Sequence, residues 1–328
     1  MAVYDYNGNE LNTVYDFNGS ELNTAYDYAG NEVFTGIEPV ALNEISEIFQ
    51  SACVDAMEYI NNLPNGYVNY IVLADTHWPS NWRHSAMVCN YLYGSGKFDK
   101  MIHLGDMVSD DNVGEAGWNA MVEDGYLYYP NRCLFAQGNH DNHLSPLSDA
   151  LVYLVPTNTH HTTHEYNNAY YYDNKKFGIR FLVLHHYLYA NSAIRDELEN
   201  WIKYRPSGYK WAILEHYPFN NGTWAEDSCI GSDAQAWLFG LIDSYSGFIG
   251  NFCGHLHLDK YDLLSTGTKD FHQMVFNMDT KGIRSDDING QCITILSINP
   301  ATENVKFYRI GCNDVFESNQ WEYSGFTK

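Results

Sequence analysis

Five short apolar runs along the chain each end in a block of acidic, amide or imidazole side chains. The blocks are LADTH (73–77), HLGDM (103–107), AQGNHD (136–141), ILEHYP (213–218) and FCGHLH (252–257). The runs are too short for helices and rich in strand-forming residues, so each predicts a buried strand that ends at its polar block. Ligands of open α/β sheets collect outside the carboxyl ends of the strands. The pattern therefore predicts a layered α/β core whose polar groups gather at one edge.

Helical patterns alternate with these strands. Within residues 41–62, Ile45, Phe49 and Cys53 follow one another at intervals of four residues, and Ile60 comes seven residues later, which is two helical turns. This spacing predicts an amphipathic helix. Further helices are predicted over 83–94, 113–124, 192–204 and 232–245. Strands are predicted over 67–74, 100–105, 132–138, 169–186 (a hairpin), 210–216, 247–254, 272–278, 291–298 and 304–310. Residues 311–328 show no clear period.

The first 35 residues are an internal repeat with a period of eleven. Its units are VYDYNGNELNT (3–13), VYDFNGSELNT (14–24) and AYDYAGNEVFT (25–35). Asn-Gly between alternating flanks favours a hairpin, because both residues tolerate positive φ. Each unit is expected to be a small hairpin or one coil of a solenoid, and a flexible polar leader is the alternative. The units resemble Tyr-Asp repeats of bacterial surface proteins and short repeats at the start of phage tail proteins.

Composition narrows the class of protein. The 328 residues include 18 Lys and Arg against 41 Asp and Glu, a formal net charge of −23. Nucleic-acid backbones and anionic membrane surfaces would be repelled by this charge, so no nucleic-acid polymer is expected as a partner. No apolar run approaches the ~18 residues that a membrane span needs, so no membrane insertion is expected.

Cellular location is constrained only weakly. The first residues lack the basic and apolar regions of a secretory signal peptide. The seven cysteines are scattered without a CxxC pair, which favours buried free thiols in a reducing compartment. We expect a cytoplasmic protein or, because of the repeats, one associated with a phage particle.

The five polar blocks together offer two Asp, one Asn and four or five His. Mixed imidazole and carboxylate donors suit Mn, Fe or Zn and argue against Ca or Mg. Seven ligands are too many for one transition ion with an open position, but they suit two ions if a carboxylate bridges them. Two ions ~3.5–4 Å apart stabilise the attacking and leaving oxygens of an in-line displacement. The blocks therefore predict a dinuclear centre for phosphoester hydrolysis.

DTH, GDM, GNHD, the lone His216 and GHLH, in this order, resemble the signature blocks of the calcineurin-like metallophosphoesterase superfamily. The resemblance covers about residues 68–310 and implies a four-layer α/β/β/α sandwich that hydrolyses phosphoesters with a metal-bridging hydroxide. The metal ligands that it implies are Asp75, His77 and His257 for the first ion, Asp106 as the bridge, and Asn139, His216 and His255 for the second ion. It also implies that His140 contacts the phosphoryl oxygen or protonates the leaving group, with Asp141 orienting it.

Departures from the patterns of two branches narrow the choice of branch within the superfamily. Protein Ser/Thr phosphatases carry an Arg after their G-D block and another before G-N-H, where this chain has GDMVSDDN (105–112) and Gln137. Purple acid phosphatases place a metal-binding Tyr three residues after the G-D aspartate, where this chain has Ser109. The pattern is most similar to the phosphohydrolase and phosphodiesterase branch. Residues that flank the centre and are candidates for shaping its pocket or contacting substrate are Trp78, Trp82, His84, Asp110, Asp111 and His143.

We therefore expect three parts: repeats at 1–36 that tether or oligomerise, a metallophosphoesterase domain at 37–310, and a C-terminal tail at 311–328. The expected activity is hydrolysis of a small phosphomonoester or phosphodiester by two divalent transition ions. The alternative is a virion or surface adhesive protein whose metal site is structural. Both hold if the enzyme is displayed on a particle and acts on envelope phosphodiesters such as teichoic acids. Self-association or particle attachment is expected to run through the repeats.

Overall fold

A computed structural model of the protein describes residues 40–77, 82–108, 132–141, 155–156, 158–161, 169–184, 192–225, 228–279, 290–312 and 318–328, together with short strands between residues 3 and 35. The predicted helix at 113–124 lies outside this part of the chain. None of the helices in the described part is long and apolar enough to cross a membrane.

The first sheet has six strands in the order β19-β18-β17-β7-β8-β9. Their bounds are β7 Val68–Leu73, β8 Lys100–His103, β9 Cys133–Phe135, β17 Cys292–Asn299, β18 Asn304–Gly311 and β19 Gln320–Ser324. Strand β8 pairs in parallel with both β7 and β9, and β17 pairs antiparallel to β7. The carboxyl ends of β7, β8 and β9 therefore lie at one edge of this sheet.

The second sheet has seven strands in the order β10-β11-β12-β13-β14-β16-β15. Their bounds are β10 His160–His161, β11 Tyr170–Asn174, β12 Ile179–Val183, β13 Lys210–Leu214, β14 Phe248–Cys253, β15 Lys260–Ser265 and β16 Asp270–Val275. Strands β12, β13, β14 and β16 are parallel, so their carboxyl ends also share one edge.

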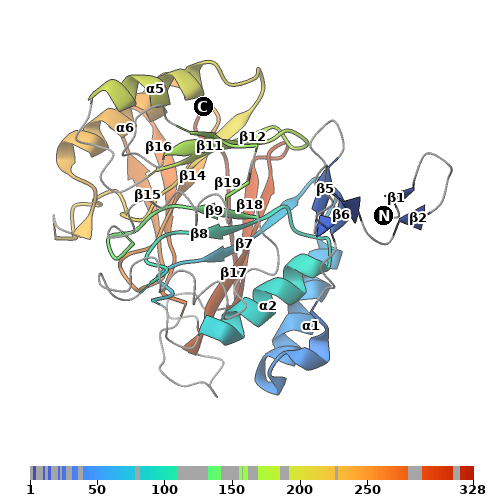
Figure 1. Cartoon of the computed structure of the whole chain (residues 1–328). Helices are drawn as coiled ribbons and strands as arrows, with labels where there is room; N and C mark the ends of the chain where they lie inside the picture. The colour runs from blue at the N-terminus through green and yellow to red at the C-terminus, as the bar shows by residue number, and fades with distance from the viewer. Residues whose placement is uncertain are drawn as a thin grey trace.

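Helices cover the outer faces of the two stacked sheets (Figure 1). Helices α1 (Glu47–Asn62) and α2 (Trp82–Gly94) lie on the six-stranded sheet, and α5 (Ser192–Lys203) and α6 (Ser232–Ser244) lie on the seven-stranded sheet. Between the sheets, the rings of Tyr70 in β7 and Phe181 in β12 meet edge-on with centroids 5.1 Å apart. This arrangement confirms the predicted four-layer sandwich.

Helix α1 buries the stripe that its sequence predicted. Phe49, Cys53 and Ile60 are all buried against the six-stranded sheet. The α-helix begins at Glu47 rather than at residue 41, because the preceding residues form a short 3-10 turn. The Glu44 carboxylate accepts the Ala41 N–H at 2.6 Å and closes that turn.

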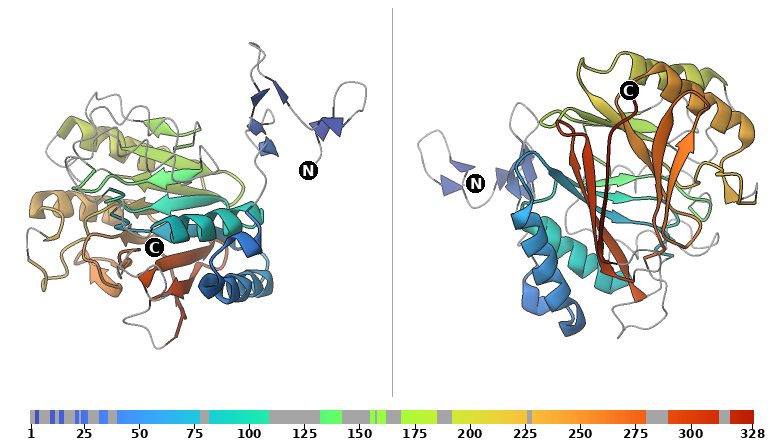
Figure 2. Two further views of the ribbon diagram at one scale, coloured as in Figure 1. Left: turned by 60° about the horizontal axis from the view of Figure 1, so that its bottom comes forward. Right: turned by 180° about the vertical axis from the view of Figure 1, so that it is seen from behind.

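Three strands of the sandwich escaped prediction, and each lies at the edge of a sheet with much of its surface exposed: β10, β15 and β19. Strand β15 buries only part of its surface, which leaves a weak hydrophobic pattern. Strand β19 lies within the expected tail and pairs with β18. Farther on, Thr327 bridges to Phe248 of β14, so this segment contacts both sheets (Figure 2).

The repeats contain three antiparallel strand pairs outside the sandwich (Figure 2). Their strands are β1 Val3–Tyr4, β2 Glu10–Leu11, β3 Val14–Tyr15, β4 Glu21–Leu22, β5 Thr24–Tyr26 and β6 Glu32–Thr35.

All seven cysteines are free thiols and six of them are buried. For these six cysteines, burial by itself explains why the thiol is free.

Candidate metal centre

The edges at which parallel strands of both sheets end carry all nine sequence-predicted site residues. Asp75 and His77 follow β7, Asp106 follows β8, and the GNHD segment (138–141) follows β9. From the other sheet, His216 follows β13, and the pair of histidines at 255 and 257 follows β14. The candidate site therefore spans both sheets.

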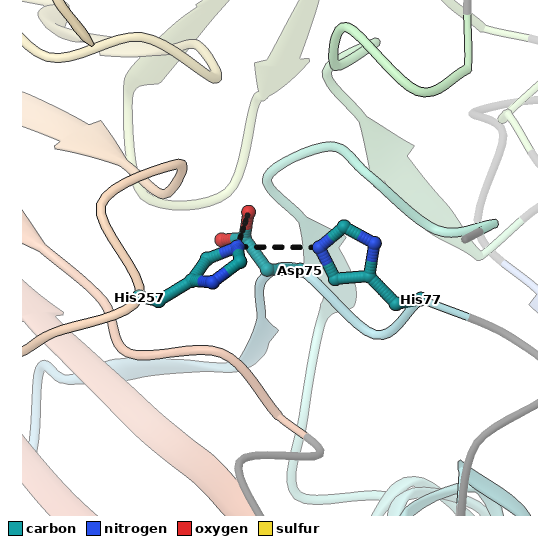
Figure 3. A group of neighbouring side chains, drawn as sticks. All are labelled: Asp75, His77 and His257. Atoms are coloured by element: carbon teal, nitrogen blue, oxygen red, sulfur yellow. Dashed lines mark hydrogen bonds and ion pairs between the residues drawn. The ribbon is translucent and has the colours of Figure 1, made fainter. Parts of the chain in front are cut away.

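One group of side chains consists of Asp75, His77 and His257 (Figure 3). His257 Nε2 lies 3.4 Å from Asp75 Oδ1 and 3.2 Å from His77 Nε2. One ligand atom from each residue lies within 4.8 Å of the other two. Ring nitrogens that face one another beside a carboxylate have the donor chemistry of a transition-metal site.

A second group consists of Asn139, His216 and His255. His216 Nε2 lies 3.0 Å from Asn139 Oδ1 and 3.2 Å from His255 Nδ1. On the other side of its ring, His216 Nδ1 donates to the Leu104 carbonyl at 2.7 Å. Metal-bound histidines usually donate their second N–H in this way, which turns the other nitrogen toward the ion.

Asp106 lies between the two groups. Its Oδ2 atom is 3.1 Å from His216 Nε2 and 4.0 Å from His77 Nε2. Its Oδ1 atom accepts the backbone N–H of His140 at 2.8 Å. One carboxylate oxygen thus faces both groups, which is the position that a bridging ligand needs.

The backbone at these residues is unusual. Six described non-glycine residues have positive φ, and five of them are predicted ligands: Asp75, His77, Asp106, His255 and His257. L-residues rarely adopt this region, and strained residues of this kind cluster at functional sites.

Three glycines of the blocks allow the loops to pack closely. A Cβ on Gly105 would lie 2.5 Å from His216 Nδ1, one on Gly138 would lie 2.2 Å from Asp106 Oδ1, and one on Gly254 would lie 2.6 Å from Asp75 Oδ2. Only a residue without Cβ fits at these positions, which explains glycine in the G-D, G-N-H-D and G-H-x-H blocks.

Burial and neighbouring charges together shift the pKa values of the histidines in the cluster. Burial lowers the pKa of His77, and burial together with nearby His216 lowers the pKa of His255 to about 4. Both rings are therefore neutral at pH 7 and keep a lone pair for an ion. Burial alone would lower the pKa of His216, but the carboxylates of Asp106 and Asp75 raise it to about 9.

The residues fit a pair of divalent ions. Asp75 Oδ1 is fully buried and accepts no hydrogen bond within the described structure. His257 Nε2 lies 3.4 Å from this oxygen, and a cation beside the carboxylate would offset the cost of burying it.

His140 lies at the open side of the cluster. Its side chain is 37% exposed, and its Nε2 atom is 3.9 Å from Asp106 Oδ2. The ring packs edge-on against His77 with centroids 4.9 Å apart. An imidazole with this exposure is accessible to a substrate that binds over Asp106.

The hydrogen bonds of Asp141 differ from those expected of a residue that orients His140. Its buried carboxylate accepts backbone N–H groups from Asp106 at 2.8 Å, Gly138 at 2.9 Å and Met107 at 3.0 Å. None of its described hydrogen bonds reaches the His140 ring. Asp141 therefore holds the backbone of two site loops against each other.

The other candidate residues, those that flank the cluster in sequence, do not all lie in the described part of the chain. Trp78, Asp110, Asp111 and His143 lie outside the described residues, as does the side chain of Trp82. The ring of His84 stacks on Phe49 of α1 with centroids 5.9 Å apart, so it faces that helix. Tyr217 was missed: its ring packs 4.0 Å from that of His255, and no sequence signal beyond its place after His216 marks it.

Two mixed sheets between helices, with this cluster at their carboxyl edge, define the metallophosphoesterase class of fold. The family model for the calcineurin-like phosphoesterase matches residues 68–259, more than half of the chain. The chain belongs to that family. It is thus a phosphoester hydrolase whose family implies a dinuclear divalent metal site.

Solved structures share the fold at low sequence identity. A dimetal phosphatase from Danio rerio superposes with a TM-score of 0.57 at 10% identity, covering 78% of this chain and 98% of that chain. Purple acid phosphatase PPD1 from yellow lupin (Lupinus luteus) seeds superposes with a TM-score of 0.51 at 11% identity, covering 80% of this chain and 54% of that chain. No protein of curated function is detectably similar in sequence.

Proposed function

We propose that the protein hydrolyses a small phosphomonoester or phosphodiester at two divalent transition ions. The observation that carries the proposal is the pair of ligand groups on either side of Asp106. Asp75, His77 and His257 would hold the first ion. Asn139, His216 and His255 would hold the second, and Asp106 would bridge. The imidazole-rich donor set favours Mn, Fe or Zn.

The ions, when bound, would supply a bridging hydroxide near neutral pH and neutralise charge on the phosphoryl group. His140 is the side chain best placed to move a proton, because it is exposed beside Asp106 without being buried among the ligands. It would hold a proton at Nε2 and give it to the leaving oxygen. Asp141 would keep Asp106 in place through the backbone.

The charge of the protein and the residue before Gly138 both bear on the kind of substrate. A net charge of −23 repels long polyanions, which favours a small substrate. Where protein Ser/Thr phosphatases carry an Arg before G-N-H, Gln137 is buried and donates to the Asp141 carbonyl at 2.9 Å. Gln137 therefore supports the loop and does not grip a phosphoryl group.

Metal content and two model substrates test the proposal. We expect about two Mn, Fe or Zn ions per chain by elemental analysis, and Mn²⁺-dependent hydrolysis of p-nitrophenyl phosphate or bis-p-nitrophenyl phosphate. The two substrates distinguish monoester from diester specificity. Metal-replete protein that hydrolyses neither ester would contradict the catalytic proposal and favour a structural metal site.

Two variants separate the proposed roles. Asp106→Asn should lose metal and all measurable turnover, because the bridge is removed. His140→Ala should keep both ions and lose about 10²- to 10⁴-fold in turnover, the usual contribution of a general acid. Asp233→Asn, whose side chain is 90% exposed on α6, is the control and should match the wild type. Equal metal loss in the Asp106 and His140 variants would show that the roles are misassigned.

A further inference from the structure

Two buried polar side chains, Thr76 and His103, lie beside the candidate metal centre and are not predicted ligands. Thr76 stands between Asp75 and His77, and His103 is the last residue of β8, three residues before Asp106. Both side chains are fully buried, and Thr76 Oγ1 lies 2.5 Å from His103 Nε2. This hydrogen bond joins the loops that carry both predicted aspartate ligands.

Backbone hydrogen bonds run along the same two loops. Asp75 N–H donates to Gly105 O at 2.9 Å, and His77 N–H donates to Asp106 O at 3.0 Å. These bonds fix the main chains but leave the peptide around Thr76 between two residues of positive φ, Asp75 at 51° and His77 at 48°. Such a segment relaxes unless its surroundings restrain it.

The burial of a histidine side chain at position 103 needs a physical explanation. Its neighbours Met101, Ile102 and Leu104 are buried apolar residues, and an apolar side chain could be buried there without the cost of removing an imidazole from water. The bond to Thr76 offsets that cost and places a planar ring between the two loops.

We propose that Thr76 and His103 form a positioning pair that sets the separation of the Asp75 and Asp106 carboxylates. The pair thereby sets the affinity of the centre for its two ions. This inference rests on the proposed ligand assignments. Partners that orient metal ligands from behind typically change metal affinity by about 10- to 100-fold when they are removed.

Calorimetric Mn²⁺ titration of chelator-treated protein tests the pair. Thr76→Val keeps the side-chain shape without the hydroxyl, and His103→Leu removes the ring. Both should bind Mn²⁺ about 10- to 100-fold more weakly than the wild type. Thr76→Ser should restore near wild-type affinity, and the double variant Thr76→Val/His103→Leu should be no weaker than the weaker single variant.

A matched control separates positioning from general stability. His272, the third residue of β16, is a half-buried histidine whose ring lies 2.7 Å from Tyr261 Oη and 2.9 Å from Gly325 O. His272→Leu should lower resistance to urea while leaving Mn²⁺ affinity unchanged. Electron paramagnetic resonance of the loaded protein adds a second readout, because coupling between two Mn²⁺ ions depends on their separation and should change in Thr76→Val.

Unchanged Mn²⁺ affinity and unchanged spin coupling in both Thr76→Val and His103→Leu would overturn the inference, even if urea resistance falls. Wild-type protein that takes up no Mn²⁺, Fe or Zn would instead overturn the proposed function, and the positioning role with it.

Discussion

Asp75, Asp106 and His257 illustrate at the scale of single residues how the candidate site is held in a strained form. Each has φ between 51° and 53°, a region that costs about 1–3 kcal/mol for residues other than glycine. Backbone hydrogen bonds to neighbouring loops hold Asp75 and Asp106 there, and glycines give those loops room to approach. The residue types were readable from the sequence, but the backbone conformation that aims them was not.

The close approach at Gly138 gives a prediction. We expect Gly138→Ala to weaken Mn²⁺ binding and to lower the free energy of unfolding by about 1–3 kcal/mol, because the new Cβ would overlap Asp106 Oδ1. Metal content and urea denaturation measure both effects. Gly240→Ala in α6 is the control: a Cβ there meets no atom within 4 Å, and alanine should stabilise the helix by about 0.5–1 kcal/mol. A Gly138→Ala protein with full metal content and stability would refute the packing argument.

Strand β9 shows at the scale of elements how a short edge strand carries part of the site. It has only three residues, yet it leads into Asn139 and His140. Tyr170 of β11 secures it: its hydroxyl accepts the Phe135 N–H at 2.7 Å and donates to the Phe135 carbonyl at 3.1 Å. A side chain of one sheet thus supplies hydrogen bonds at the edge of the other.

Removing this hydroxyl should loosen β9. We expect Tyr170→Phe to lower the free energy of unfolding by about 1–3 kcal/mol, because a buried amide and carbonyl lose a partner. Amide hydrogen exchange at Phe135 should become faster. Tyr172→Phe, on the same strand, loses a hydroxyl bond to the Asp99 side chain and should leave exchange at Phe135 unchanged. Equal exchange at Phe135 in the wild type and Tyr170→Phe would rule out this support.

The centre is assembled across the whole molecule. The six-stranded sheet supplies Asp75, His77, Asp106 and Asn139, and the seven-stranded sheet supplies His216, His255 and His257. Neither sheet by itself carries all of the proposed ligands. Loss of the packing between the sheets would therefore separate the groups, and bound ions would in turn stabilise that packing.

All nine candidate site residues lie outside the repeats, which gives a prediction for residues 1–36. We propose that they act as a tether or oligomerisation element, and their deletion should leave turnover and metal content unchanged. If they mediate self-association, the deletion should also reduce the molar mass measured by light scattering. A large fall in turnover after deletion would contradict this division between repeats and hydrolase domain.

The sequence by itself determined the four-layer fold, and it predicted nine site residues that the structure brings close together. It could do so because strand ends and ligand types are local properties, visible in short apolar runs and the polar blocks that follow them. Weakly patterned edges such as β15 and β19 were not predictable in this way, because half-exposed strands carry little periodicity.

Only the tertiary structure decided how the site residues act on one another. It turned Asp141 toward four backbone amides instead of the His140 ring, and it paired Thr76, which follows β7, with His103 of β8. Hydrogen bonds between segments distant in the chain depend on the separation and orientation of whole elements, and no local pattern of residues encodes either.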